Sequence, residues 1–249
     1  MKLNSAVFAA SLLVMALPAF ADEPAPAPAD PLSFNVSAIS DYRYRGISQT
    51  RFYPTVQGGA DYADASGFYV GTWLSGIQWI RDTGGNGRVE WDFYGGYKNE
   101  VAKGLTLDVG GLQYFYANNK LKNVPGWADA NTFELYGALT FGPVTVKYSH
   151  SLTNLFGTVD SKGSGYLEAA ATFDLGEGFT LTPHVGHQAI KHWSAGSYTD
   201  YSVTLNKDYA GFTFGATLIG TDAEKTLYTG PTGKFNGRTG VVVSIKKTF

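Results

Sequence analysis

A repeated two-residue alternation of apolar and polar side chains constrains this chain more than any other feature. About twelve segments show it, near residues 33–44, 54–62, 67–76, 88–97, 104–116, 130–140, 144–151, 165–173, 179–187, 198–206, 209–220 and 238–249. Successive side chains on a strand point to opposite faces, so each segment predicts a strand with one apolar face. In this register no Asp, Glu or Arg falls on an apolar face, and Lys247 is the only formal charge there. A lipid-facing Lys or Arg costs about 2–4 kcal/mol at the bilayer midplane, so the segregation indicates contact with a membrane.

The links between these segments alternate in length. Short links lie at 63–66, 98–103, 141–143, 174–178 and 207–208, and longer ones at 45–53, 77–87, 117–129, 152–164, 188–197 and 221–237. Short periplasmic turns and long external loops are typical of outer-membrane barrels. The sequence therefore predicts an all-β fold, a single antiparallel transmembrane β-barrel of about twelve strands. A soluble protein whose alternating strands pack on a second sheet is the alternative.

The two ends of the chain indicate export to the envelope. Lys2, an apolar run at 6–17 and the triplet Ala19-Phe20-Ala21 are typical of a cleaved signal peptide at 1–21. A Pro- and Ala-rich periplasmic leader at 22–32 then precedes the expected barrel at 33–249. The final strand ends in Phe249, which we expect the barrel-assembly machinery to recognise. These features predict the outer membrane of a Gram-negative bacterium.

Aromatic residues stand at both ends of the apolar faces. Phe34, Tyr62, Phe68, Tyr97, Phe173, Phe179 and Phe249 lie at the turn side, and Tyr42, Tyr44, Phe115 and Tyr148 lie at the loop side. Aromatic girdles of this kind mark the two membrane interfaces. We therefore expect outer-membrane lipid and lipopolysaccharide as partners. The formal net charge of −2 gives nucleic acid no basic surface, so no such partner is expected.

Several motifs together resemble the TorF-like porin family. They are the segment Ser40 to Ser48 (SDYRYRGIS), the triplet Phe141-Gly142-Pro143, the stretch Tyr148 to Leu152 and the Lys-Thr-Phe terminus. The resemblance covers essentially the whole mature chain. It implies an outer-membrane β-barrel of the porin type and leaves the solute open. Lys247 departs from the pattern, because barrel-assembly signals usually carry an aromatic or apolar residue at that position.

The polar faces supply the candidate functional residues, which we expect to line a pore or its constriction. They are Asp41, Arg43, Arg45, Asp61, Glu90, Asp92, Asp108, Glu134, Lys147, Glu168, Asp200 and Lys246. We expect Arg43 to reach across and pair bidentately with a carboxylate, and Arg45 to lie at the outer rim. The excess of acids predicts passive diffusion of small hydrophilic solutes with a preference for cations. A satisfied polar plug, or a structural or adhesive barrel acting through its loops, is the rival interpretation.

Catalytic and cofactor chemistry is not expected. His150 and Ser151 are adjacent, so on one strand they point to opposite faces and cannot form a nucleophile–base pair. His184 and His187 are separated by an odd number of positions and diverge in the same way, so a shared metal ion would require a bulge. The sequence thus predicts no enzyme, no metal site and no cofactor.

Overall fold

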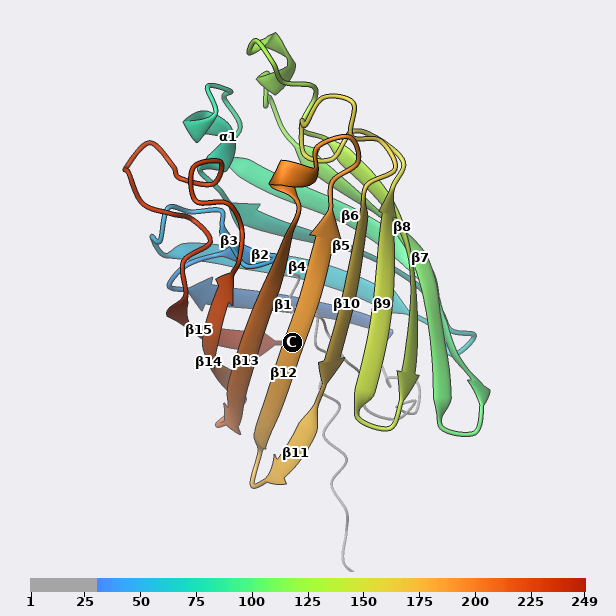
Figure 1. Ribbon diagram of the computed structural model, residues 1–249. Coiled ribbons are helices and arrows are strands. Elements are labelled where there is room, and N and C mark those ends of the chain that lie inside the picture. Colours follow the sequence, from blue (N-terminus) through green and yellow to red (C-terminus); the bar gives the residue numbers. More distant parts are fainter. Residues whose placement is uncertain (1–30) are drawn as a thin grey trace, which may run out of the picture.

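The strands form one closed antiparallel barrel. A computed structural model describes residues 31–249, and Figure 1 shows the strands curving around a common interior. In the part of the chain that the structure describes, the sheet runs β10-β9-β8-β7-β6-β5-β4-β1-β15-β14-β13-β12-β11, and a pairing of β10 with β12 closes it. β11 follows β10 after a one-residue break at Thr172. The twelve-stranded barrel with one extra strand confirms the predicted fold class.

The strand bounds agree with the alternation to within a few residues in most of the chain. The barrel strands are β1 (Leu32–Ile39), β4 (Thr55–Ala63), β5 (Phe68–Gly76), β6 (Val89–Ala102), β7 (Leu105–Tyr116), β8 (Thr132–Phe141), β9 (Val144–Ser151), β10 (Gly165–Ala171), β11 (Phe173–Gly176), β12 (Phe179–Ala189), β13 (Tyr198–Tyr209), β14 (Phe212–Thr221) and β15 (Gly240–Thr248). Two short strands, β2 (Arg43–Tyr44) and β3 (Ile47–Ser48), pair only with each other. The helical turns are α1 (Trp79–Asp82), η1 (Leu121–Asn123) and η2 (Ser194–Gly196).

The barrel has two unlike ends. At one end, which we call the turn end, the links between strands are two to four residues long. At the other, the loop end, the links are long and carry α1, η1 and η2, which lie at the top of Figure 1. Among the described residues no helix combines the length and the hydropathy that a membrane crossing requires. The predicted signal peptide at 1–21 and most of the leader lie outside the described residues, and β1 already begins at Leu32.

The outer face of the barrel is apolar. Its exposed side chains include Phe34, Val56, Phe68, Val70, Trp91, Phe93, Leu135, Leu139, Val146, Leu167, Val185, Val203, Leu205, Phe214, Leu218, Val241, Val243 and Ile245. Two lysines share this face near the turn end, Lys207 opposite Phe214 and Lys247 opposite Val36. Lys247 lies over the rings of Phe212 and Phe249 at 5.2 and 5.1 Å. Lys207 was expected in a turn, but β13 continues past it to Tyr209.

A seam between β1 and β15 completes the barrel. Their register pairs Val36 with Lys247 and Ala38 with Ile245. The terminal residue extends the ladder, because the N–H of Phe249 donates to the carbonyl of Phe34 at 2.8 Å and the N–H of Phe34 donates back at 3.2 Å. Closure removes the free strand edges that would otherwise pair with another chain.

The first expected strand is where sequence and structure differ most. The alternation predicted one strand over 33–44, whereas β1 ends at Ile39 and the chain then turns into the barrel. Inside, β2 and β3 form a hairpin whose turn is Arg45-Gly46, with φ angles of 45° and 78°. We call residues 41–50 the inward hairpin. Positive φ at both central positions is the type I′ geometry that matches the twist of tight hairpins.

Candidate functional site in the barrel interior

The interior divides into two halves with different access to solvent. Inward side chains of the loop half are buried: Gln57, Trp73, Ser75, Glu90, Asp92, Tyr114, Tyr116, Glu134, Ser149, Tyr166, Gln188, Asp200, Ser202, Ile219 and Val242. Most inward side chains of the turn half are partly exposed, among them Ser33, Asn35, Asp61, Tyr69, Lys98, Asp108, Tyr136, Thr140, Lys147, Thr180, Thr182, Asn206, Thr213 and Ser244. Solvent therefore reaches the interior from the turn end and is excluded from the loop half.

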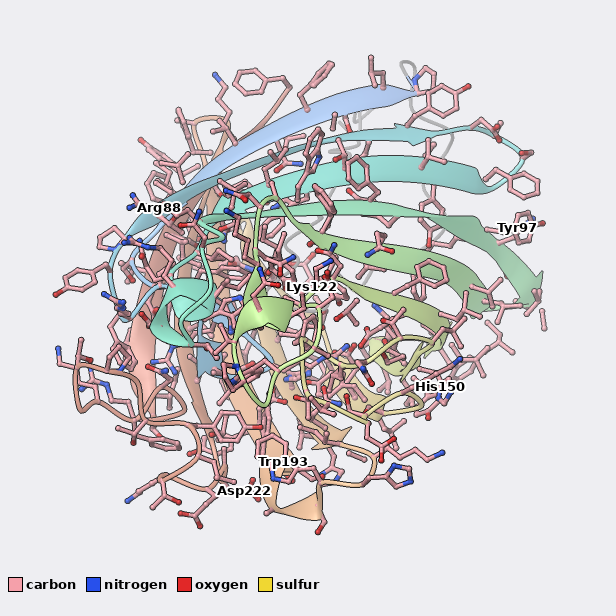
Figure 2. The ribbon with its side chains drawn as sticks, turned by 90° about the horizontal axis from the view of Figure 1, so that it is seen from above. Arg88, Tyr97, Lys122, His150, Trp193 and Asp222 are labelled. Atoms are coloured by element: carbon pink, nitrogen blue, oxygen red, sulfur yellow. The ribbon has the colours of Figure 1, made fainter. Side chains whose placement is uncertain are left out.

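An apolar cluster fills much of the loop half. Its buried members include Ile39, Tyr42, Trp73, Ile77, Ile80, Leu112, Tyr114, Tyr116 and Leu121, with Tyr44 and Phe156 packed against them. Ile80 and Leu121 come from the turns α1 and η1 in two different loops. Figure 2, which looks onto the loop end, shows these turns, with Lys122 labelled, lying over the middle of the barrel. The loops thus fold over the interior and cover it.

Tyr42 lies inside the barrel, which corrects the prediction that it belongs to an aromatic girdle. Its side chain is 0% exposed, and its ring meets that of Trp73 edge to face at 5.4 Å. Its hydroxyl donates to Glu90 of β6. Tyr44 is likewise inside, where its hydroxyl bonds that of Tyr114 at 2.6 Å. The girdle prediction was wrong for both residues because the outer wall ends at Ile39.

Arg43 anchors the inward hairpin to a neighbouring loop. Its Nε donates to Asp41, and its Nη1 donates to the carbonyls of Gly46, Asn236 and Arg238 at 2.9, 3.1 and 3.2 Å. Asp41 also accepts from Ser48 at 2.6 Å. The expectation that Arg43 reaches across to a distant carboxylate was wrong, since its partner carboxylate is two positions away. Two backbone acceptors, Asn236 and Arg238, instead tie Arg43 to the loop between β14 and β15, and Gly46 is an acceptor within the hairpin itself.

Arg45 makes the pairing that was expected of Arg43. Its Nη1 and Nη2 donate to the two carboxylate oxygens of Glu134 at 3.1 and 2.7 Å, and Nη1 also donates to Gln188 Oε1 at 2.6 Å. Arg45 is only 9% exposed, so it does not lie at an outer rim as expected. Burial by itself lowers the pKa of Arg45, but the Glu134 carboxylate together with Tyr44 and Tyr114 outweighs burial and raises this pKa well above its ordinary value. The guanidinium therefore stays charged.

The inward hairpin spans the interior from wall to wall. Tyr42 binds β6 and Arg45 binds β8 and β12, and β6 and β12 are five positions apart in the ring of twelve strands. Gly46 at the tip packs closely on a third part of the wall, since a Cβ there would lie 2.3 Å from Thr221 Cγ2 and 2.8 Å from Asp200 Cβ. Only glycine combines this approach with a φ of 78°. The contacts fix the hairpin across the bore.

A second polar network lies on the wall formed by β10, β12 and β13. His184 Nε2 is 3.2 Å from Glu168 and His184 Nδ1 is 3.6 Å from Asp200. The hydroxyl of Tyr166 donates to Asp200 at 2.8 Å. The carboxylates here have polar partners, so this wall is a satisfied network.

Asp92 is the exception among the interior carboxylates. Its side chain is 0% exposed, and neither carboxylate oxygen has a hydrogen-bond partner. The residues opposite it on the adjoining strands are Trp73 and Tyr114. A carboxylate buried without a donor is costly.

Three charged residues of the turn half contact tyrosines. Tyr94 donates to Asp61 at 2.5 Å and Tyr69 donates to Asp108 at 2.6 Å. The Nζ of Lys147 lies 4.5 Å over the ring of Tyr136. Tyrosine thus supplies the neutral lining between the charges of this half.

All twelve predicted site residues lie inside the barrel, but the structure does not bring them together at one constriction. Asp41, Arg43, Arg45, Glu90, Asp92, Glu134 and Asp200 belong to the loop half or the hairpin within it, Glu168 lies near mid-height, and Asp61, Asp108, Lys147 and Lys246 lie toward the turn end. Tyr42, Tyr166, His184 and Gln188 were missed. On β10, Tyr166 lies two positions before Glu168, and on β12, Gln188 lies four positions after His184. The period of two therefore places Tyr166 and Gln188 on inward faces, and this is the signal that could have found them.

Comparisons with solved structures show that porins share this fold. The solved structure "KdgM porin" has a TM-score of 0.56 and 8% identity, and the match covers 87% of this chain and 99% of that one. A NanC porin structure has a TM-score of 0.51 and 10% identity, over 87% of this chain and 98% of that one. At identities this low, the structural match shows a shared fold alone. No curated protein matches the chain.

A family model extends the match over nearly the whole sequence. It covers residues 23–249 and is described as "Bacterial protein of unknown function (Gcw_chp)". The match includes every barrel strand, the inward hairpin and the loops that cover it. The chain therefore belongs to the Gcw_chp family of bacterial proteins of unknown function.

Proposed function

We propose that this protein is a porin-like channel of the outer membrane through which small hydrophilic solutes diffuse passively. The observation that carries the proposal is a barrel with an apolar outer face around a charged interior whose turn half is open to solvent. The fold shared with the KdgM and NanC porins supports it. An apolar outer band around a polar interior is what a membrane channel requires.

The solutes that fit the interior best are cations. The inward side chains include Asp61 and Asp108 in the turn half and Glu90, Asp92 and Glu134 in the loop half. A related structure is described as KdgM porin in complex with disordered oligogalacturonate, which is an acidic polymer. The carboxylates in this barrel would repel such a polyanion, so its selectivity differs from that of an acidic-sugar channel.

The wider setting follows from the same proposal. The exposed aromatic residues at both ends of the outer face would contact membrane lipid and lipopolysaccharide. Phe249, which is 65% exposed and closes the seam, would serve the barrel-assembly machinery. The motifs that resemble TorF-like porins agree with this assignment.

Planar-bilayer recording tests the channel. Purified protein should give discrete conductance steps, and a salt gradient should give a reversal potential on the cation-selective side. Asp92→Ala, Glu134→Ala and Asp108→Asn should each move that potential toward zero, because each removes an interior negative charge. Asp160→Asn, in an exposed loop position with a side chain that is 78% accessible, is the matched control and should leave the potential unchanged. Silent bilayers would refute the proposal.

A non-conducting barrel that acts through its loops is the second candidate. One observation favours it: the loop half is filled by an apolar cluster in which Tyr42 and Ile80 are 0% exposed. A barrel closed in this way could serve as a structural or adhesive platform. If no solute condition or variant produces conductance while cell-surface binding persists, this candidate replaces the channel.

A further inference from the structure

The contacts around Arg45 have the composition of a ligand site. Its guanidinium makes a two-pronged pair with the Glu134 carboxylate at 3.1 and 2.7 Å, and a third hydrogen bond to Gln188 Oε1 at 2.6 Å. Its Cζ lies 4.1 Å from the ring centre of Tyr166 and 4.8 Å from that of Tyr44. A carboxylate fork, an amide oxygen and aromatic faces are the groups that recognise a planar delocalised cation.

Most of this site belongs to the barrel wall and not to the inward hairpin. Glu134 lies on β8, Tyr166 on β10 and Gln188 on β12. Only the Tyr44 ring comes from the hairpin itself. If the hairpin moved away, the wall would keep the carboxylate, the amide and one aromatic face in place.

Other contacts hold the wall residues ready for a cation. The Nε2 of Gln188 donates to the carbonyl of Gly165 at 3.0 Å, which directs Oε1 into the site. The Tyr166 hydroxyl donates to Asp200 at 2.8 Å, which fixes its ring, and Tyr114 donates to Glu134 at 3.4 Å. Preorganised acceptors lower the ordering cost that a ligand would otherwise meet.

The segment that brings Arg45 to this site is held in a costly conformation. Arg45 has a φ of 45°, which residues other than glycine and asparagine rarely adopt. Strained backbone persists where surrounding contacts over-determine it, and the contacts of the guanidinium are among those that hold Arg45 in place. Arg45 therefore behaves as a tethered ligand.

We propose that the recess formed by Glu134, Tyr166 and Gln188 is a binding site for guanidinium-type cations, and that Arg45 is its built-in occupant. A solute carrying a guanidinium group competes with Arg45 and releases the inward hairpin. The gating half of this inference rests on the proposed channel function, whereas the binding half does not. The proposed recess narrows the class of solutes from cations in general to planar, delocalised cations.

The test of binding uses methylguanidinium as the probe and isothermal titration calorimetry on the purified barrel. Arg45→Ala empties the recess and should bind the probe saturably. Arg45→Ala/Glu134→Gln should bind it at least about tenfold more weakly, because the carboxylate fork is lost. Arg45→Ala/Glu177→Gln, altered at an exposed carboxylate of the turn end, should bind as Arg45→Ala does.

The unaltered chain should bind methylguanidinium more weakly than Arg45→Ala, because a tethered group competes at an effective concentration of about millimolar. Equal binding by Arg45→Ala and its Glu134→Gln derivative, or no saturable binding by either, would overturn the site.

Release of the inward hairpin is measured independently in a chain whose own arginine is intact. The sequence has no cysteine, so Gln49→Cys, at a position that is 9% exposed, gives a single label site on the hairpin. Methylguanidinium should accelerate its reaction with a charged maleimide, and methylammonium at the same concentration should not. No acceleration would refute gating. If methylguanidinium binds and bilayers stay silent, the channel function fails and the binding site stands.

Discussion

The loop half and the turn half of the interior share one wall but differ in what lies between its sides. In both halves, the strands direct polar and aromatic side chains into the interior. In the turn half, most of these inward side chains remain partly exposed. In the loop half the same kind of wall is sealed because the inward hairpin and the turns α1 and η1 pack against it. Inserted loop segments, and not the wall, therefore set the free bore of this barrel.

Of the substitutions that test why the loop half is sealed and the turn half is not, Glu134→Ala should have the largest effect. Glu134→Ala leaves the Arg45 guanidinium buried without its carboxylate, and breaking a buried pair from one side costs about 3–5 kcal/mol. We expect the loop half to open, with faster maleimide labelling at Gln49→Cys and a lower Tm. Glu177→Ala at the turn end is the control, and equal effects of the two substitutions would contradict the account.

Substitution of Gly46 should give the next largest effect. Gly46 and Gly211 both have a φ of 78°, but a Cβ on Gly46 would meet Thr221 Cγ2 at 2.3 Å, whereas nothing lies within 4 Å of one on Gly211. Because both glycines have the same φ, the cost of placing an alanine at positive φ cancels between the two variants. The remaining difference in the free energy of unfolding reports the contact with Thr221. Gly46→Ala should therefore lower the free energy of unfolding by about 1–3 kcal/mol more than Gly211→Ala, as measured by urea titration in micelles. Equal losses would show that the hairpin tip does not dock on the wall.

A substitution at Asp92 should act in the opposite direction. Its carboxylate is buried without a partner, so Asp92→Asn should raise the free energy of unfolding by about 1–3 kcal/mol. Asp61→Asn is the control, because Asp61 accepts a hydrogen bond from Tyr94 and gains nothing from neutralisation. Lower stability of Asp92→Asn would show that the carboxylate has a partner in solution.

Cysteine labelling should locate the boundary between the two halves, and its substitutions should disturb the structure least. Thr180→Cys lies in the partly exposed turn half, and Ser202→Cys replaces a buried hydroxyl that has no hydrogen bond to lose. Each 1.4 kcal/mol of opening free energy slows labelling about tenfold, so Ser202→Cys should react at least about tenfold more slowly. Equal rates would mean that solvent reaches both halves.

Alternation along the sequence was enough to predict the wall. β9 at Val144–Ser151 coincides with its predicted range, and the apolar outer faces are those that the period of two assigned. This works because a strand between lipid and an aqueous interior must separate its two faces chemically. Each strand residue faces either lipid or the interior, so the alternation can be read from a few neighbouring residues.

The inward hairpin could not be predicted in the same way. From Asp41 to Arg45 the alternation continues unchanged after β1 ends, but both faces of this stretch are then enclosed by the barrel. Its position depends on Arg45 meeting Glu134, which is 89 positions away along the chain. Only Arg45-Gly46, flanked by Tyr44 and Ile47, gave a local sign of a hairpin turn. Long-range pairing of this kind leaves no periodic trace.

The seam between Phe34 and Phe249 has a consequence for how the molecule is made. Since β15 pairs with β1, the barrel cannot close before the last of its strands has been made. Until β15 is in place, β1 and β14 each retain an unsatisfied edge that can pair with another polypeptide. Biogenesis must therefore protect both edges until β15 has paired with them, and a chain without β15 would be left as an open sheet.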